Sequence, residues 1–151
     1  MIVREYTPGD LKEIMQLFYD TVHTINRKDY TEQQVNVWAT GIVDLDDWDQ
    51  AFQHHHTFVA LEKDQIVGFG DIDDTGYLDR LYVHKDFQGI GIATRLCNYL
   101  EIIVESKCIT VYASITAIPF FEKRGYKLIK SQLIERHGVV LTNYLMIKKL
   151  L

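Results

Sequence analysis

The first thirty residues change from the period of a strand to the period of a helix. Residues 2–6 mix β-branched and polar positions, and the turn-forming sequence Thr-Pro-Gly-Asp follows them. Apolar side chains then recur three and four positions apart, at Leu11, Ile14, Met15, Leu17, Phe18 and Val22. The pattern predicts a short strand and then a helix whose N-cap is Asp10.

Two more helices and a three-stranded meander are predicted for the middle of the chain. Thr31, with Gln34 at the capping-box position, begins a second helix whose inner face carries Val35 and Trp38. Residues 44–52 have the spacing of a third, short helix. Strands joined by tight turns are predicted at residues 56–62, 66–72 and 77–84.

The second half of the chain predicts a crossover unit followed by a hairpin. A helix over residues 91–105 has an apolar face, and a strand at residues 109–113 follows it. A second helix, over residues 116–124, is ended by Gly125. The last two strands are predicted at residues 127–136 and 142–148. The strands on either side of the first helix should be parallel and joined by a right-handed crossover.

These elements predict an α+β fold, an α/β/α sandwich. Its central sheet should be mixed, mostly antiparallel, with about six or seven strands flanked by helices. Neither a repeat nor a linker interrupts the pattern, and a length of 151 residues suits one domain. We therefore expect a single domain over residues 1–151.

Composition and charge narrow the class of protein. Of the 151 residues 47% are hydrophobic and 25% are charged, which is typical of ordinary globular domains. The net charge of −5, with 16 Lys and Arg residues, argues against a nucleic-acid partner. Neither a signal peptide nor a transmembrane helix is expected, so we expect a cytoplasmic protein. Cys97 and Cys108 lie in apolar stretches and predict buried free thiols.

The segment from Leu81 to Thr94 carries the clearest chemical signal. A strand ends in a glycine-containing loop and a helix begins directly, which is an arrangement that binds phosphate groups. A Walker A loop is absent, because no Lys follows a suitable glycine. A dinucleotide fingerprint would need a glycine or alanine where Thr94 stands. The third pattern, Q/R-x-x-G-x-[GA], is met by residues 88–93.

With this loop the chain resembles the GNAT superfamily of acetyl-CoA-dependent N-acetyltransferases. A second anchor is the segment from Val111 to Tyr126, which is similar to the family's A-x-x-F-[YF]-x-x-x-G-[FY] sequence. The resemblance covers nearly the whole chain. It is closest to a bacterial subgroup in which this segment reads S-I-T-A-x-P-F-F-E, as residues 114–122 do here, and whose members mostly have no assigned substrate.

The resemblance implies a set of residues that bind acetyl-CoA, the co-substrate. The pyrophosphate should lie on backbone N–H groups of Gln88, Gly89, Ile90, Gly91, Ile92, Ala93 and Thr94. The Val83 backbone should meet the pantetheine arm and polarise the thioester carbonyl, and Leu81 and Tyr82 line the same strand. Ser114 stands where many relatives have an Asn that contacts the cofactor, and its hydroxyl could replace part of that role.

Acetyl transfer also needs a neutral amine and a way to release a thiolate. Tyr77 and Asp79 are two positions apart on one strand and should face the same side. Asp79 is our candidate for the base or for a group that orients a water, the alternative being a salt bridge with Arg80 or Arg95. Many relatives protonate the thiolate with a Tyr where this chain has Phe121. A thiol with a pKa of about 8.5 leaves without strong acid catalysis, and Tyr112, Tyr126, Tyr144 or water could take that part.

The acceptor site should be built from the first two helices and the closing hairpin. We expect His23, Tyr30 and Trp38 to contact the acceptor, although Trp38 and Trp48 could equally be core residues. An acidic run over residues 44–49 could attract a cationic amine, or it could form a helix N-terminus and a solvated face. Residues 54–56 are all His, but neighbours on a strand point to opposite faces, so we expect no metal site.

Two functions remain open from the sequence. The first is transfer of an acetyl group from acetyl-CoA to a primary amine of a small molecule or peptide, directly in a ternary complex. The second is a non-catalytic acyl-CoA-binding or regulatory module. The resemblance also makes a homodimer possible, and we expect neither a nucleic acid nor a membrane as partner.

Overall fold

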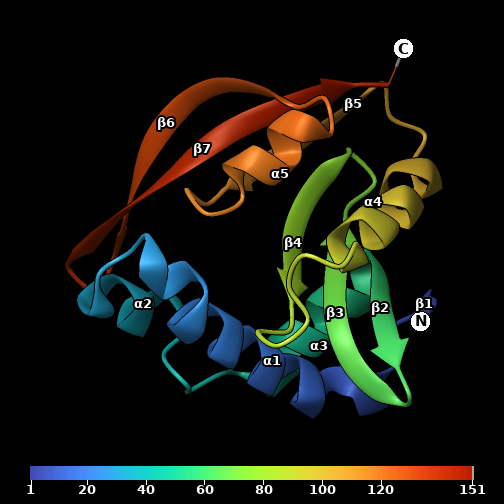
Figure 1. Cartoon of the computed structure of the whole chain (residues 1–151), viewed down its shortest axis with the longest axis horizontal. Coiled ribbons are helices and arrows are strands. Elements are labelled where there is room, and N and C mark those ends of the chain that lie inside the picture. The colour runs from blue at the N-terminus through green and yellow to red at the C-terminus, as the bar shows by residue number, and fades with distance from the viewer. Residues whose placement is uncertain (151) are drawn as a thin grey trace.

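The computed structural model describes residues 1–150, and one seven-stranded sheet runs through them (Figure 1). Its strands lie in the order β1-β2-β3-β4-β5-β7-β6. Their bounds are Ile2–Glu5 (β1), His56–Glu62 (β2), Gln65–Ile72 (β3), Tyr77–Val83 (β4), Cys108–Ala113 (β5), Lys127–Arg136 (β6) and Val139–Lys149 (β7). β4 and β5 are parallel and the other neighbouring pairs are antiparallel, which confirms the predicted mixed sheet.

Helices cover both faces of the sheet. Their bounds are Leu11–Thr24 (α1), Glu32–Trp38 (α2), Leu45–His54 (α3), Ile92–Ile103 (α4) and Ile118–Lys123 (α5), with short 3-10 turns at Pro8–Asp10 (η1) and Asn26–Lys28 (η2). α4 and α5 pack on one face with a core that includes Leu96 and Phe121. α1, α2 and α3 pack on the other face, around Phe18 and Phe52. The predicted α/β/α arrangement is therefore confirmed.

α4 lies unusually close to β3 because two positions of that strand are glycines. A Cβ at Gly68 would lie 2.8 Å from a methyl carbon of Ile92, and one at Gly70 would lie 2.9 Å from a methyl carbon of Leu100. Only glycine leaves room for the helix at this distance. The close approach fixes the start of α4 beside the end of β4.

β4 and β5 separate soon after they begin, and this opening positions the functional site. Their pairing covers only Tyr77 with Thr110 and Leu78 with Val111. β4 also carries a bulge against β3, because Ile72 pairs with Leu78 while Asp71 pairs with Arg80. The residue between Leu78 and Arg80, Asp79, is the extra one. The remainder of β4 is thus free of β5 along one side.

Local capping follows the sequence at one helix and departs from it at another. The Thr31 hydroxyl accepts from Gln34 N at 3.1 Å, and the Gln34 amide oxygen accepts from Thr31 N at 2.9 Å, which confirms the capping box. Asp10 is the N-cap residue of α1, as predicted, but its side chain makes no capping hydrogen bond to that helix. Its carboxylate instead accepts from Thr7 N at 2.9 Å and from the Arg4 guanidinium at 2.8 and 2.9 Å.

Three other predictions are refined by the structure. The run of histidines is not one strand, since His54 ends α3, His55 joins the elements and His56 begins β2. Both cysteines are free, but only Cys97 is buried, while Cys108 is partly exposed at the start of β5. Asp44 caps α3 by accepting from Asp47 N at 3.2 Å.

None of the helices in residues 1–150 has the length and apolar character needed to cross a membrane.

Candidate active site

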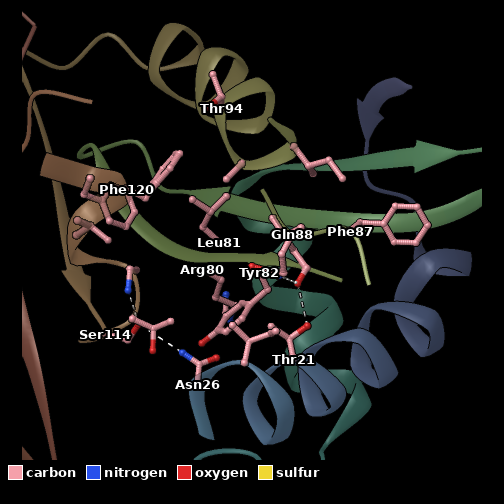
Figure 2. Close-up of a pocket in the computed structure, with 18 of the residues that line it drawn as sticks. Thr21, Asn26, Arg80, Leu81, Tyr82, Phe87, Gln88, Thr94, Ser114 and Phe120 are labelled. Atoms are coloured by element: carbon pink, nitrogen blue, oxygen red, sulfur yellow. Dashed lines mark hydrogen bonds between the residues drawn. The ribbon is translucent and has the colours of Figure 1, made fainter. Parts of the chain in front are cut away.

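A cavity of about 500 Å³ occupies the opening between β4 and β5 (Figure 2). Its walls come from the second half of β4, the loop that follows it, the first turn of α4, the segment from β5 into α5, and α1. Most residues expected at the acetyl-CoA site line it: Leu81, Tyr82, Val83, Gln88, Gly89, Gly91, Ile92, Ala93, Thr94, Ser114 and Phe121. Ile90 does not line the cavity, and its side chain is 65% exposed.

The loop before α4 and the first turn of that helix form one end of the cavity. The first α-helical hydrogen bond runs from Arg95 N to Gly91 O at 3.1 Å, so the three N–H groups before it have no acceptor within the helix. Gly89 and Gly91 have φ angles of +73° and +92°, which favour glycine, and a Cβ at either would meet nothing within 4 Å. The Gln88 side chain donates to Val83 O at 2.8 Å and holds the loop against β4. The result is an open cradle of amide donors for an anion.

The end of β4 offers one more backbone donor. Val83 lies opposite Gly68 in β3, and His84 N donates to Val67 O at 2.8 Å. This bond makes Val83 and Gly68 a non-hydrogen-bonded pair, so the N–H and C=O of Val83 point away from β3. The C=O accepts from the Thr21 hydroxyl at 3.0 Å. The Val83 N–H faces the opening that β5 leaves.

Asp79, in β4, lines the cavity. Its side chain is 28% exposed and its Oδ2 lies 3.4 Å from Arg80 Nη1. Burial raises the pKa of the Asp79 carboxyl, and the nearby Arg80 charge opposes part of that shift. Tyr77 lines the same region, and burial together with the Asp79 charge raises its pKa to about 12. Asp79 and Tyr77 thus share one side, as the sequence predicts.

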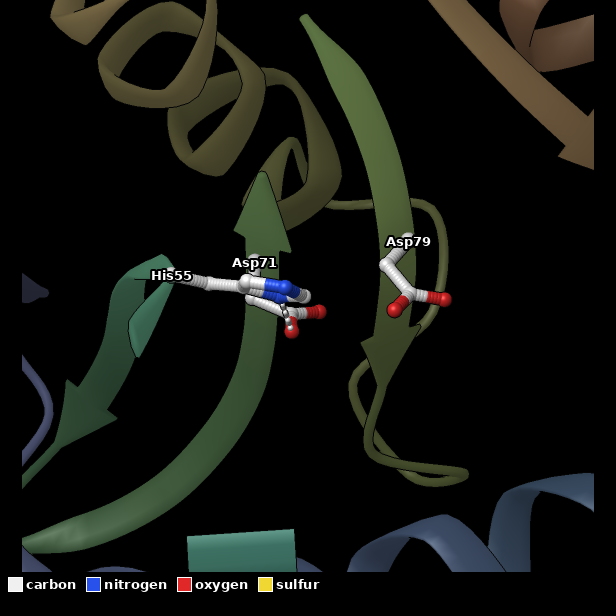
Figure 3. A group of neighbouring side chains, drawn as sticks. All are labelled: His55, Asp71 and Asp79. Carbon is white, nitrogen blue, oxygen red and sulfur yellow. Dashed lines mark hydrogen bonds and ion pairs between the residues drawn. The ribbon is translucent and has the colours of Figure 1, made fainter. Parts of the chain in front are cut away.

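His55 and Asp71 form a hydrogen-bonded pair beside Asp79 (Figure 3). Ligand-type atoms of His55, Asp71 and Asp79 all lie within 4.8 Å of one another. Asp71 is fully buried and accepts from His55 Nδ1 at 2.8 Å and from Arg80 Nη1. The bond to Asp71 raises the pKa of the His55 imidazole. Arg80, whose guanidinium carbon lies 4.6 Å from the Trp48 ring centroid, supplies positive charge to both carboxylates.

The sequence analysis did not find the pair of His55 and Asp71. One signal was available, because Asp71 is the only charged residue in the strand Gln65–Ile72, which is otherwise apolar after its first position. A buried charge needs a partner, and its partners come from the start of β2 and from β4. The identity of those partners depends on strand register, which the sequence pattern leaves open.

A second cavity, of about 400 Å³, adjoins the first on the side of the β6–β7 hairpin. Five residues line both cavities: Trp38, Asp79, Tyr82, Tyr112 and Ser114. Trp38 Nε1 donates to the Tyr82 hydroxyl at 3.2 Å, which ties α2 to β4 at the junction. The carboxyl group of Asp79 is therefore accessible from both spaces.

The three residues expected at the acceptor site are distributed differently. Trp38 lines both cavities, and Tyr30 lines the second. The Tyr30 hydroxyl donates to Thr142 O and accepts from Ile115 N, both at 2.9 Å, so it joins the hairpin to the start of α5. His23 lines neither cavity. Its Nε2 lies 2.7 Å from Ala39 O and its ring stacks on Tyr19, and these contacts are structural.

Phe121 in α5 stands at the position where many relatives have a tyrosine that acts as the general acid. Phe121 is 2% exposed and packs between Phe120 and Tyr126. Tyr126 is buried and its hydroxyl donates to Glu101 at 2.7 Å; burial and this bond raise its pKa far above the ordinary value. Tyr126 is therefore no proton donor for the cavity. Ser114 Oγ accepts from Ala117 N at 3.2 Å and so shapes the turn into α5.

Comparisons with known proteins identify relatives of this chain and solved structures with the same fold. The model of the acetyltransferase (GNAT) domain matches residues 26–148. The uncharacterized N-acetyltransferase YafP of Escherichia coli K12 is 33% identical over 145 residues, which cover 95% of this chain and 93% of YafP. The GCN5-related N-acetyltransferase structure from Rhodopseudomonas palustris has a TM-score of 0.94 at 30% identity, covering 99% of this chain and 95% of that one.

A more distant structure shares the fold. The PaiA N-acetyltransferase of Thermoplasma acidophilum, solved in complex with coenzyme A, has a TM-score of 0.78 at 16% identity, and 98% of each chain is covered. Its similarity extends over the whole sheet and its helices. Together with the family match over residues 26–148 and the relatives that are 30% or more identical, these findings establish that the chain belongs to the GNAT family of acetyltransferases.

Proposed function

We propose that this GNAT N-acetyltransferase moves the acetyl group of acetyl-CoA directly to a primary amine, in a ternary complex of both substrates. The observation that carries the proposal is the position of Asp79, which lines both cavities. One cavity ends at the N-terminus of α4 and suits the donor, and the other is free for the acceptor. A single catalytic domain over residues 1–151 follows, because both cavities draw residues from the two halves of the chain.

The residues of the first cavity fit the donor. Its phosphates would bind the free N–H groups at the start of α4, where Gly89 and Gly91 leave the backbone open. The Val83 N–H would donate to the carbonyl oxygen of the thioester and stabilise the negative charge that develops there. Acetyl-CoA supplies the activated acetyl group, and the chain supplies position and charge.

Asp79 is proposed to remove the proton from the acceptor amine, directly or through one water. A lysine-like amine has a pKa of about 10.4, so it must lose a proton before its nitrogen attacks. The raised pKa of Asp79 makes the carboxylate a better base than an exposed one. Arg80 Nη1, 3.4 Å from Asp79 Oδ2, compensates part of its negative charge, and the paired His55 and Asp71 lie beside it.

The transfer then balances without a covalent enzyme intermediate. The amine nitrogen forms a bond to the carbonyl carbon and the carbon–sulfur bond breaks. The second amine proton is lost to solvent, because Asp79 already holds the first. The thiolate takes its proton from Tyr112, which lines both cavities, or from water. Because Phe121 has no hydroxyl, we expect weak acid catalysis and reliance on a leaving thiol of pKa about 8.5.

Asp79→Asn tests this function. The amide has nearly the same size but accepts no proton, so kcat should fall by about 100-fold while the Kd for acetyl-CoA stays within twofold. Asp74→Asn is the control, because Asp74 is an exposed carboxylate on the nearby turn and lines neither cavity. CoA release would be followed with a panel of primary amines. An unchanged kcat in Asp79→Asn would remove Asp79 from the mechanism.

A further inference from the structure

The second cavity has more specific chemistry than an amine alone requires. Five of the residues that line it are aromatic: Tyr30, Trp38, Tyr77, Tyr82 and Tyr112. Tyr30 meets Trp38 edge-on, with ring centroids 5.1 Å apart, and Tyr77 meets Tyr112 edge-on at 5.9 Å. Faces of this kind favour a flat, aromatic body by stacking and edge contacts.

Two charged groups mark different sides of this aromatic space. Among the described residues that line the cavity, Asp79 is the only acid and Arg136 the only base. Asp79 comes from β4, at the junction with the donor cavity, whereas Arg136 comes from the last position of β6. Gln132, Ile134 and Arg136 alternate along β6 and share its inner face. The two charges therefore approach the space from different strands.

Arg136 is uncompensated in the described part of the chain. It is exposed, and no carboxylate of residues 1–150 forms an ion pair with it. An Arg at the rim of an aromatic cavity, with no internal partner, fits a carboxylate by paired N–H bonds.

A third polar residue of the cavity wall is Asn143. Asn143 Oδ1 is buried and has no hydrogen-bond partner within residues 1–150. Asn143 lies in β7 opposite Gln132 and lines the cavity between the hairpin and the junction. Because this oxygen is itself buried, the amine partner that the cavity offers is the Asp79 carboxylate, and the anion partner is the Arg136 guanidinium.

We infer that the acceptor is an amino-carboxylate with an aromatic body, its amine at Asp79 and its carboxylate at Arg136. This inference rests on the proposed function, because it assigns a substrate class to the same acceptor site. Tyr77 and Tyr112 hold the ring, and Arg136 selects the anion. Amines without a carboxylate enter the same space but leave Arg136 unpaired.

The test compares three acceptors of similar shape: 4-(aminomethyl)benzoate, 4-methylbenzylamine and benzylamine. The wild-type enzyme should show a kcat/KM at least about tenfold higher for the carboxylate than for either neutral amine, since charge-assisted bonds are the strong ones. In Arg136→Gln this ratio should fall to about one. Lys130→Gln removes a positive charge from the same strand at a residue outside the cavity, and the ratio should survive there.

Equal kcat/KM values for the three acceptors in the wild-type enzyme would overturn the inference, as would a ratio that Arg136→Gln leaves intact. Turnover of other amines with none of these three would also overturn it, while the proposed acetyltransferase function would stand. Failure of the proposed function has a different signature, which is the absence of turnover with any amine, whether or not acetyl-CoA binds. Raising the salt concentration should lower the carboxylate preference in the wild-type enzyme and not in Arg136→Gln.

Discussion

Gly91 is the position at which one side chain would most directly disturb the donor site while the fold survives. It is the N-cap of α4, its φ is +92°, and a Cβ there would meet nothing within 4 Å. The left-handed backbone costs an ordinary residue about 1–2 kcal/mol. A domain with a free energy of unfolding of about 5–15 kcal/mol tolerates that cost. Gly91→Glu should therefore fold.

The expected loss of affinity follows from electrostatics at the start of the helix. The new carboxylate would compete for the free N–H groups and repel the pyrophosphate. Like charges 4 Å apart repel by about 4 kcal/mol at an effective dielectric constant of 20. Residue 91 is exposed, so solvent and salt reduce this to about 2 kcal/mol. That energy corresponds to an acetyl-CoA Kd about thirtyfold higher.

Calorimetric titration with acetyl-CoA measures this loss, and Gly138→Glu is the matched control. Gly138 also has a positive φ, of +78°, and also leaves a Cβ in open space, but it lies between β6 and β7 at the hairpin tip. Its variant carries the same added charge and a similar backbone strain, so its Kd should equal that of the wild type. If Gly91→Glu binds acetyl-CoA as tightly as Gly138→Glu does, the start of α4 is not the phosphate site.

Three further predictions concern stability and pH. Glu101→Gln should lower the free energy of unfolding by about 3 kcal/mol in urea titrations, because the carboxylate accepts from buried Tyr126 and from partly buried Arg124 and Lys148. The control Glu105→Gln, at an exposed position, should cost under about 0.5 kcal/mol. Burial raises the pKa of the Glu101 carboxyl, but the hydrogen bonds from these three donors outweigh burial and hold the pKa below 4.5. The difference in unfolding free energy between wild type and Glu101→Gln should therefore be full above pH 4.5 and should shrink as the pH falls through the pKa of the folded protein. The rate of acetyl transfer should fall on acidification with a midpoint above pH 3.8, because burial raises the pKa of Asp79 and only the deprotonated carboxylate is a base. The pH–rate profile of Asp79→Asn should lack this acidic decline. Gly70→Val should lower the free energy of unfolding by about 1–3 kcal/mol in urea titrations, because its Cβ would lie 3.0 Å from the Arg80 carbonyl oxygen, which cannot move aside as a side chain would.

The elements and the donor loop were predictable because their signals are local. The period of apolar residues identified the helices and strands to within a few positions, and the loop with Gly89 and Gly91 identified the start of α4. Asp10 is the N-cap of α1 as predicted, but its carboxylate binds Arg4 rather than the helix, a contact that the local sequence does not specify. His23 lies outside both cavities, because the sequence does not specify which way a side chain near the end of a helix points.

The environment of Asp79 depends on a bulge that no local pattern specifies. Strict alternation would place Arg80 on the face of the sheet opposite to Asp79. In the structure Leu78 and Leu81 both pack toward the α4 core, three positions apart, so the two residues between them turn together to the other face. Arg80 consequently pairs with Asp79 and with Asp71 at once. The salt bridge and the base are therefore not alternatives, because the pairing lets a partly buried carboxylate stay charged while burial keeps its pKa above the ordinary value.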